Sequence, residues 1–539
     1  MAWPNARPPF KRETLSATDR PQAIPIMDWY GIWAGTVGWP ADEGACTPQD
    51  VPQGVRLSLQ PPQLTEPFLQ VGDRPWEAHL GYMQVMYDEG RYRLWYEASP
   101  SQRTAEQMKI APIGGGGYPG FTCYAESADG FHWERPNLGM YDFGGSTDNN
   151  IITESGILNP KGWHIYQVFK DPTAPPQERY KSNCQAGVWL LDGKPLPAMD
   201  KRQIGELRNK MQLEGQTPEE ISQRLVFQFQ MLGFTSPDGL HWTRLPRPIM
   251  EPPGRLDMRN MVFYDEELGC YVSYLRGHVG RRRTLRRSIS ARFDTGWEMP
   301  RQVLMADSQD PPDMDFYDFG YCRVPGSPYH LMFFSAYSRG QDTMEIHLAV
   351  SRDGCIWTRP ERRPIITRDI PGRPEEKYGV IYPSPGFVPL GDGWWGLAYF
   401  GHRRCHWDFD YKRWTFPEPS GAYHWAMWKT DRLVALEAPT NGRVTILDRI
   451  CAGKELRLNF QTSADGCIKA ELVASVGVAQ PQASPAIEAH SFAECDALSG
   501  DSLSAPVTWR GNASLAKLKG RNVLVRLHMV RAKLFSVAL

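Results

Sequence analysis

Apolar and polar residues alternate along most of the chain, and polar, glycine or proline turns interrupt the alternation. Five strand–turn–strand patterns are present, and their turns are marked by Asp88, Asp171, Asp265, Pro325 and Gly391. Side chains that alternate with a period of two belong to half-buried β-strands. The pattern therefore predicts an all-β protein built from antiparallel hairpins.

A second pattern is the sequence S-x-D-G-x-x-W, which occurs at 127–133, 236–242 and 351–357, with a degenerate form at 290–297. Serine and aspartate oxygens accept hydrogen bonds from backbone N–H groups within a turn, and glycine adopts the positive φ that a tight turn needs. We interpret each copy as a turn followed by a tryptophan that packs between strands. The repeated aspartates are therefore predicted to be structural and not catalytic.

Hairpins and repeats together describe a four-stranded unit that recurs five times, as is typical of a β-propeller. The predicted blades span 71–145, 146–250, 251–304, 305–370 and 371–436. Residues 437–539 alternate in a different style and predict a separate C-terminal β-sandwich. The proline-rich residues 1–70 are expected to pack as an arm on the propeller.

The segment 195–225 interrupts the second blade and predicts a short helical insert. Ile204, Leu207 and Met211 share one helical face, and 217–220 forms a capping box with proline at the first helical position. This insert could serve as a lid, as a dimer contact, or as an addition to the fold without a role in function. A homo-oligomer would form through the insert or through the sandwich.

Composition narrows the classes of function. The formal net charge of -1 gives no general attraction to nucleic acid or to an anionic membrane. The chain shows neither a signal-peptide pattern nor an apolar run long enough to span a membrane, so we expect a cytoplasmic protein, or a secreted one if a signal segment has been removed. Cysteines without C-x-x-C spacing and the lack of phosphate-loop or metal-ligand motifs predict no metal and no cofactor.

Several phrases resemble a bacterial branch of propeller proteins related to invertase/levanase-type and arabinanase/xylosidase-type glycoside hydrolases. They are "PWE" at 75–77, "CYAESADGFHWERPNLG" at 123–139, "STDNNII" at 146–152, "LAVSRDGCIWTRP" at 348–360 and "LRLNFQTSADGCIKAEL" at 456–472. The resemblance implies a five-bladed propeller with a trailing β-sandwich and a carbohydrate substrate in the central funnel. The invertase signatures W-M-N-D-P-N-G and E-C-P are absent, so the resemblance does not imply fructoside specificity.

A glycosidase needs two carboxyl groups, one to protonate the leaving oxygen and one to attack the sugar or activate water. The starts of the innermost strands converge in a propeller, and the catalytic candidates there are Asp257, Glu376, Glu77 and Asp315. We expect Asp257 to act as nucleophile or base, Glu376 or Glu77 as acid, and Asp315 as stabiliser or as modulator of a neighbouring pKa. Candidate substrate-binding residues are His79, Asp148, Asn149, Asn150, Arg259, Arg276, Asp313, Tyr317, Glu375 and Tyr382. Asp171 lies in a K-D-P sequence but occupies a turn, so we do not predict it to be a catalytic residue.

The sequence thus predicts an enzyme that hydrolyses a glycoside or oligosaccharide or transfers its glycosyl group. A propeller that binds carbohydrate without hydrolysing it is a second reading. A third is a sialidase-like enzyme that uses Arg259 or Arg276 together with Tyr317 as nucleophile. The identity of the sugar, its linkage and the stereochemical outcome stay open.

Overall fold

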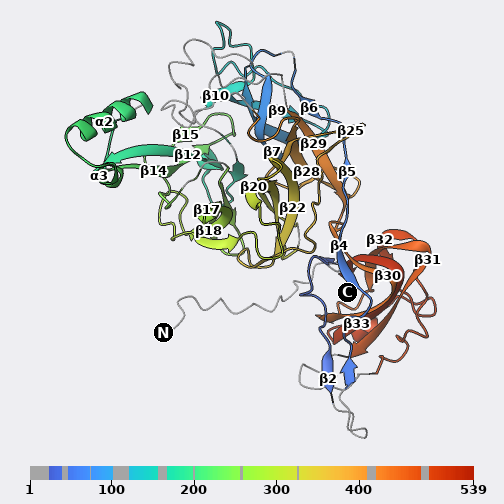
Figure 1. The fold of residues 1–539 in the computed structure, drawn as a ribbon. Helices are drawn as coiled ribbons and strands as arrows, with labels where there is room; N and C mark the ends of the chain where they lie inside the picture. Colours follow the sequence, from blue (N-terminus) through green and yellow to red (C-terminus); the bar gives the residue numbers. More distant parts are fainter. Residues whose placement is uncertain are drawn as a thin grey trace. The chain divides into compact units, whose positions relative to one another are not determined.

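The computed structural model is mostly β (Figure 1). It describes residues 23–38, 47–72, 74–100, 120–155, 165, 167–197, 201–254, 256, 259–324, 327–408, 421–474 and 485–539. The chain divides into two compact units. The first unit comprises Met1–Gln60, Pro325–Ser327 and Lys429–Leu539, and the second comprises Pro61–Val324 and Pro328–Trp428. Within the described residues, no helix is long and apolar enough to cross a membrane.

Three antiparallel sheets follow one another in the second unit. The first consists of β7 (His79–Asp88), β8 (Arg91–Ser99), β9 (Gly120–Ser127) and β10 (Ile151–Ser155). The second consists of β11 (Val168–Lys170), β12 (Tyr180–Leu191), β14 (Leu225–Ser236) and β15 (Thr243–Arg244), with β13 (Lys194–Pro195) beside β12 and the 3-10 turn Pro176–Glu178 before it. The third consists of β16 (Met261–Asp265), β17 (Cys270–Val279), β18 (Arg282–Ser290) and β19 (Arg301–Leu304).

A ten-stranded sheet completes this unit, where the sequence predicts two separate blades. Its first group is β20 (Met314–Arg323), β21 (His330–Ser338), β22 (Thr343–Ser351) and β23 (Trp357–Thr358). Its second group is β26 (Val380–Pro383), β27 (Val388–Pro389), β28 (Trp394–His402) and β29 (Ala422–Lys429), with β5 (Gln63–Leu64) and β6 (Leu69–Gln70) along β29. The two groups are joined through a single parallel pair, Met344 and Val380. β24 (Asp369–Ile370) and β25 (Arg373–Lys377) form a small hairpin.

Hydrogen bonds link each of these five strand groups to the next. They run from Gln84 Nε2 to Val168 O (2.7 Å), from Val262 N to Gln167 Oε1 (2.9 Å), from Tyr274 Oη to Gly354 O (2.7 Å), from Ser335 Oγ to Ile381 O (3.0 Å) and from Tyr92 Oη to Pro389 O (2.6 Å). The last bond joins the fifth group to the first, so the series of contacts closes on itself.

The S-x-D-G-x-x-W copies form the same hydrogen-bonded turn. At 127–133, Gly130 N donates to Ser127 Oγ (2.9 Å), and the next two backbone N–H groups donate to Asp129 Oδ1 (2.8 Å each). Trp133 Nε1 donates to Gly130 O (2.9 Å), and Gly130 has a φ of 84°. The copies at 236–242 and 351–357 repeat these bonds. The prediction that these aspartates stabilise turns is confirmed.

Each of these turns also receives a hydrogen bond from an aromatic side chain of a neighbouring strand group. The glycine carbonyls are the acceptors, in the pairs Trp425 Nε1–Gly130 O (2.8 Å), Trp95 Nε1–Gly239 O (2.7 Å) and Tyr274 Oη–Gly354 O (2.7 Å). A buried donor and acceptor that satisfy each other avoid the cost of lost hydration. The repeat therefore fixes both the turn and the contact between neighbouring groups.

We expect Asp238→Ala to lower the free energy of unfolding by about 1–2 kcal/mol, because two backbone N–H groups lose their acceptor. Burial opposes ionisation of Asp238, but hydrogen bonds from His241 and Leu240 lower its pKa to about 2. The difference between wild type and variant should therefore be full at pH 7 and shrink as the pH falls from about 4 toward 2. Urea unfolding at several pH values measures it, and equal stability at pH 7 would contradict the assignment.

The first unit contains one six-stranded sheet in the order β32-β31-β33-β30-β4, with β1 beside β33. Its strands are β1 (Ile24–Pro25), β4 (Arg56–Leu59), β30 (Val434–Ile450), β31 (Arg457–Ala474), β32 (Asp501–Pro506) and β33 (Asn522–Ala538), accompanied by the hairpin β2 (Thr36–Gly38) and β3 (Thr47–Gln49) and the 3-10 turn Ala516–Leu518. In the described part of 23–60, strands β1 and β4 belong to this sheet, and the packing of residues 1–70 on the propeller stays a prediction. The two strands pair with β33 and β30, whose backbone groups need partners.

The helical insert is confirmed as α2 (Lys201–Leu213) and α3 (Pro218–Arg224), between β13 and β14 (Figure 1). Thr217 caps α3: its hydroxyl accepts a bond from Glu220 N (3.3 Å), and Glu220 Oε2 accepts one from Thr217 N (2.8 Å). Ile204 and Met211 are buried with Ile221 in a small core of their own.

Candidate functional site

Glu77 and Asn150 lie in one buried hydrogen-bond network before β7 and β10. Tyr96 Oη donates to Glu77 Oε1 (2.6 Å), and Asn150 Nδ2 donates to the same Tyr96 Oη (2.7 Å). Arg135 Nε is 3.3 Å from Glu77 Oε2, and Trp76 Nε1 donates to Asn150 Oδ1 (3.1 Å). Both residues are 0% exposed. They hold the start of the first sheet in place and offer no surface to a substrate.

Asp148 and Asn149 belong to the turn that precedes β10. Asp148 is exposed, and its backbone N–H donates to Ser146 Oγ (3.1 Å). Asn149 Oδ1 accepts a bond from Ile151 N (3.0 Å), and its amide donates to Tyr141 O (2.8 Å). These are the contacts of a turn-capping asparagine and not those of a sugar-binding pair.

Asp315, at the start of β20, is buried between two arginines. Its Oδ2 lies 2.9 Å from Arg283 Nη1 and 2.6 Å from Arg339 Nη2. Asp313 accepts bonds from Ser338 Oγ (2.7 Å) and from Gly340 N, and these bonds lower the pKa of its carboxyl group. Both oxygens of Asp315 and Oδ2 of Asp313 thus accept bonds from neighbouring groups of the protein.

Glu375 and Glu376 lie on the exposed hairpin strand β25. Glu375 is exposed, and Glu376 forms ion pairs with Arg373 (3.3 Å) and Arg403 (3.1 Å), all on the surface. Surface ion pairs of this kind contribute little and are screened by salt. The structure does not bring Glu375 or Glu376 into the group of residues described below. Asp257 lies outside the described residues.

Arg259, two residues before β16, joins three strand groups through its guanidinium. Nη2 lies 2.6 Å from Asp318 Oδ2 and 2.6 Å from Pro383 O, and Nη1 lies 3.1 Å from Met83 O. The side chains of Arg259 and Asp318 are both 0% exposed. Arg259 is therefore a structural tie between three strand groups, and not a substrate ligand.

Glu97, near the end of β8, is a carboxyl group that the sequence reasoning missed. Its side chain is partly exposed, yet burial of the carboxyl group raises its pKa to about 7, in spite of a hydrogen bond from Tyr82 N. It lies where β7 bulges between Leu80 and Met83, opposite β8. Bulges re-aim side chains and are frequent beside active sites. The available signal was a lone glutamate within the apolar run "RLWYEA".

The raised pKa of Glu97 predicts a pH-dependent stability. The folded state binds this proton more tightly than the unfolded state, so wild type loses stability as the pH rises from about 4.5 to about 7, on the order of 3 kcal/mol. Glu97→Gln has no such loss and should become the more stable protein above pH 7. Urea unfolding at pH 4.5 and pH 8 tests this, and a difference that does not change with pH would contradict it.

Gly81 makes room for the carboxyl group of Glu97. A Cβ at position 81 would stand 2.7 Å from Glu97 Oε2, which is closer than real contacts allow, and 3.2 Å from its Cδ, so the side chain of Glu97 would have to move. We expect Gly81→Ala to displace Glu97 and to lower any turnover that depends on Glu97 by about tenfold or more, because small displacements of a reacting group are costly. Turnover of Gly81→Ala measures the effect. Gly205→Ala in α2, where a Cβ would meet nothing within 4 Å and φ is not positive, is a control for added side-chain volume.

His79 and His402 lie in the same region, close to Arg404. Burial and the charge of Arg404 lower the pKa of His79 to about 3. Burial, Arg404 and His79 together lower the pKa of His402 well below its usual value. Both imidazoles are therefore neutral at pH 7 and able to accept or donate a hydrogen bond.

Aromatic rings extend from Glu97 across the neighbouring strand groups. The ring of Tyr82 lies 5.8 Å from that of Tyr382, which stacks on Phe400 (4.7 Å) and lies 6.2 Å from Tyr317. The Tyr317 hydroxyl is 2.8 Å from His406 Nε2. Tyr82 and Tyr317 are partly exposed. We call the rings of Tyr82, Tyr382 and Tyr317 the tyrosine floor. Neighbouring rings in it meet edge to face, with 73° and 68° between their planes, so each partly exposed ring could contact the face of a sugar by itself.

Two arginines border the far end of the tyrosine floor. Arg283 and Arg276 place their guanidinium carbons 4.7 Å and 6.0 Å from the centre of the Tyr317 ring. Of the residues predicted from sequence, the structure therefore brings together His79, Arg276, Tyr317 and Tyr382, and it adds Glu97. Among the described residues, no group of three or more His, Cys, Asp or Glu could hold a metal ion.

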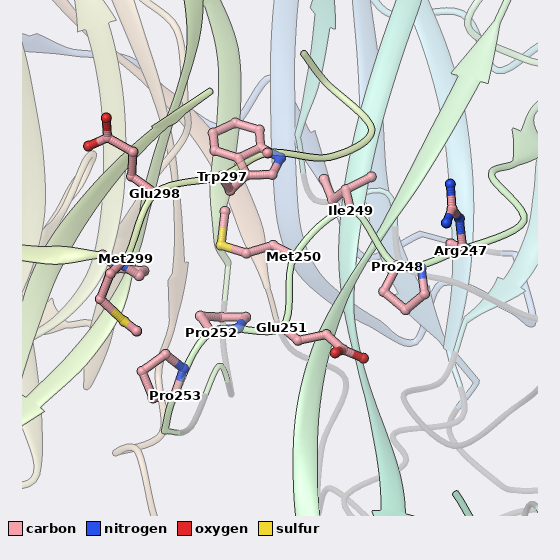
Figure 2. Close-up of a pocket in the computed structure, with 12 residues that line it drawn as sticks. Arg247, Pro248, Ile249, Met250, Glu251, Pro252, Pro253, Trp297, Glu298 and Met299 are labelled. Carbon is pink, nitrogen blue, oxygen red and sulfur yellow. The ribbon is translucent and has the colours of Figure 1, made fainter. Parts of the chain in front are cut away.

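A recess of about 440 Å³ lies elsewhere, between 247–253 and 296–300 (Figure 2). Trp297 and Met250 lie next to each other in it, beside Pro252. Its carboxylates, Glu251 and Glu298, belong to exposed residues. The recess therefore offers shape but no carboxyl group in an unusual environment, and we place the candidate site at Glu97.

No family model and no curated protein matches the chain. Solved structures similar to it include a thermostable family-43 glycoside hydrolase (12% identity, 70% of this chain and 96% of that chain covered, TM-score 0.38). A family-32 β-fructofuranosidase from Bombyx mori is 9% identical to this chain. The match covers 88% of this chain and 93% of that chain, with a TM-score of 0.36. The catalytic domain of a family-62 α-L-arabinofuranosidase from Coprinopsis cinerea is 12% identical to this chain. The match covers 68% of this chain and 97% of that chain, with a TM-score of 0.37. These are enzymes of the group that the sequence resembles.

Proposed function

We propose that the chain is a glycoside hydrolase whose proton donor is Glu97. The observation that carries this proposal is a partly exposed glutamate opposite the bulge of β7, and burial of its carboxyl group raises its pKa to about 7. An acid of that strength is about half protonated at neutral pH, which suits proton transfer to a leaving oxygen. The neighbouring tyrosine floor would bind the sugar, and the neutral His79 would hydrogen-bond a hydroxyl.

The proposed architecture is a five-bladed propeller, with the five linked strand groups of the second unit as blades. The closed series of hydrogen bonds supports it, and so does the single parallel pair between the fourth and fifth groups. For the C-terminal part we propose a β-sandwich in which the long strands β30 and β31 take part in both layers. Bulges in both strands support this, because bulges let a strand bend from one layer to another.

A second carboxylate is required for hydrolysis, and Asp257 remains the prediction for it. Asp257 stands two residues before Arg259, the residue that joins three strand groups. A retaining enzyme needs a separation of about 5–5.5 Å between its two carboxyl groups, and an inverting enzyme about 6.5–9.5 Å. Asp257→Asn is expected to lose hydrolysis and to keep sugar binding.

A carbohydrate-binding propeller without catalysis is the second candidate. The observation that favours it is that Glu77 and Asp315 are held by neighbouring protein groups and do not face a substrate. A sialidase-like enzyme is supported by the contact between Arg276 and the Tyr317 ring. It is not supported by Arg259, whose guanidinium is hydrogen-bonded to Asp318.

A panel of aryl glycosides and oligosaccharides, neutral and acidic, decides between these candidates. The hydrolase proposal expects release of the aryl group or of a sugar from at least one member of the panel. Calorimetric binding without any release would leave the binding reading instead. Release that Tyr317→Phe abolishes but Glu97→Gln leaves intact would favour the sialidase-like reading.

A further inference from the structure

The fourth, degenerate copy of the repeat departs from the other three. In the full copies, the tryptophan indole donates to the carbonyl of the turn glycine, which stands three residues earlier. In the copy at 290–297, Trp297 Nε1 donates to Phe293 O (3.1 Å) instead, and Gly296 and Trp297 line the recess of about 440 Å³ (Figure 2). A local rule that is broken at one position is often broken for a function. The recess is therefore a candidate for a binding site of its own.

Trp297 can bind a ligand in this recess only through its ring. The side chain is partly exposed and lies beside the buried Met250, close to Pro252 (Figure 2). Its indole N–H is already taken by Phe293 O, and this bond also fixes the orientation of the ring. A tryptophan ring gives a large apolar contact at a low entropic cost, because only two torsions need to be fixed. The recess thus has an aromatic and apolar surface.

Backbone hydrogen bonds hold both walls of the recess in place without a ligand. Ile249 N donates to Met231 O (2.8 Å), and Met231 N donates to Met250 O (2.8 Å). On the other wall, Glu298 N donates to Ile289 O (3.0 Å). A site that exists before binding spends little free energy on ordering. Its volume of about 440 Å³ lies within the range of about 300–1,000 Å³ that is usual for small-ligand pockets.

The lining of the recess carries charges of both signs. Glu251 and Glu298 supply carboxylate oxygens, Arg247 supplies N–H donors, and all three residues are exposed. Glu251 accepts a bond from Gln230 Nε2 (2.6 Å), and neither Arg247 nor Glu298 forms an ion pair with another residue in the described part of the chain. Donors and acceptors around one recess suit a neutral ligand whose hydroxyl groups both donate and accept. A ligand with a net charge would meet a like charge there.

Four prolines in the lining argue against an extended peptide as the ligand. They are Pro248, Pro252, Pro253 and Pro300. Proline has no backbone N–H, whereas a peptide that docks as an added strand needs backbone donors as well as acceptors. The carbonyl of Pro253 is moreover occupied by Arg286 Nη1 (2.8 Å). The walls therefore offer apolar contact and few backbone partners, which fits the C–H face of a sugar ring better than a peptide.

We propose that the recess is a second carbohydrate-binding site, separate from the site at Glu97, which holds one sugar unit of a neutral polysaccharide. The C–H face of the sugar packs on the Trp297 ring, and its hydroxyl groups bond to Glu251, Glu298 and Arg247. Such a site keeps the protein on a polymer without taking part in the chemistry. The inference goes beyond the proposed hydrolase function and does not rest on it.

Affinity electrophoresis of the full-length protein tests this inference. Each native gel contains one neutral polysaccharide, namely xylan, arabinan, galactan, mannan or mixed-linkage β-glucan, and the retardation gives Kd. We expect at least one of them to retard wild type. Trp297→Ala should weaken that binding by about tenfold or more, the usual effect of truncating an aromatic anchor. Trp29→Ala removes a tryptophan that is 45% exposed in the other compact unit, and it should change nothing.

Two further variants keep the test decisive if Trp297→Ala does not fold. Trp297→Phe retains a smaller ring and should keep part of the binding, and Glu298→Ala, at an exposed position, should weaken the binding by about threefold or more. The inference is overturned if no polysaccharide retards wild type, or if neither a Trp297 variant nor Glu298→Ala weakens the binding. Loss of the retardation in the presence of a proline decapeptide would overturn the choice of a sugar.

Hydrolysis and retardation together separate this inference from the proposed function. If Trp297→Ala loses the retardation while wild type cleaves no glycoside, the recess stands and the hydrolase proposal fails. If glycosides are cleaved and Trp297→Ala is retarded like wild type, the hydrolase proposal stands and the recess fails. Retardation that is lost in Tyr317→Ala and kept in Trp297→Ala would place the binding at the tyrosine floor, which would also overturn the inference.

Discussion

Replacing Glu97 by glutamine is expected to lower kcat by about 100- to 10,000-fold on a glycoside with a poor leaving group, the range that general acid catalysis contributes. Glutamine keeps the shape of the side chain but has no proton to give. The effect should be smaller on an aryl glycoside whose leaving group needs no protonation. Steady-state kinetics on one substrate of each kind measure both effects, and KM should change less than kcat.

The matched control for this variant is Glu376→Gln. Glu376 is also a glutamate that the sequence reasoning selected as the acid, but it forms surface ion pairs with Arg373 and Arg403. Its replacement should leave kcat within about twofold of wild type, as expected for an exposed ion pair. Full activity in Glu97→Gln, together with a loss in Glu376→Gln, would reverse our assignment.

Arg259→Met is expected to lower the free energy of unfolding by about 3–5 kcal/mol, because it leaves the carboxylate of Asp318 buried without its partner. The same replacement removes the bonds that Arg259 makes to Met83 O and Pro383 O. Urea unfolding followed by tryptophan fluorescence measures the loss.

Two further variants identify the cause of that loss. The double replacement Arg259→Met with Asp318→Leu removes both charges, and it should be less destabilised than Arg259→Met alone. Arg292→Gln, which breaks an exposed pair, should stay within about 1 kcal/mol of wild type. A double variant that is less stable than Arg259→Met would show that the carbonyl contacts, and not the charge, dominate.

Local turn chemistry was predictable from the sequence because it depends on residues close together in the chain. Ser127, Asp129 and Gly130 satisfy one another within four positions, and the copies at 236 and 351 do the same. The capping box at Thr217 is equally local. The prediction that Asp171 belongs to a turn also agrees with the structure, since Thr173 N and Thr173 Oγ1 donate to Asp171 Oδ1 (2.9 and 2.7 Å).

The carboxyl groups of the site were predictable only in part, because their partners come from distant positions. Glu77 and Asp315 stand near the starts of inner strands, as expected. Their hydrogen bonds to Tyr96 and their ion pairs to Arg283 and Arg339 depend on tertiary contacts that no local pattern encodes. Glu97 was missed because its position depends on a bulge in a different strand, β7.

Strand pairing of the first residues was also beyond local reasoning. In the segment before residue 60, apolar and polar residues alternate only weakly, and this favoured the prediction of an irregular arm. The described strands β1 and β4 are short, and they pair with strands more than 370 residues later in the chain, as in the pairs Ile24–Val537 and Leu59–Val434. Short edge strands gain order from the sheet that they join and not from their own pattern.

The most direct test of the account is the titration of the Glu97 carboxyl group by ¹³C NMR in glutamate-labelled protein, with the resonance assigned through Glu97→Gln. The account predicts a midpoint near pH 7, because burial disfavours the charged form. A midpoint near 4.5, the ordinary value for glutamate, would show that Glu97 is an ordinary surface carboxylate and would contradict its role as proton donor.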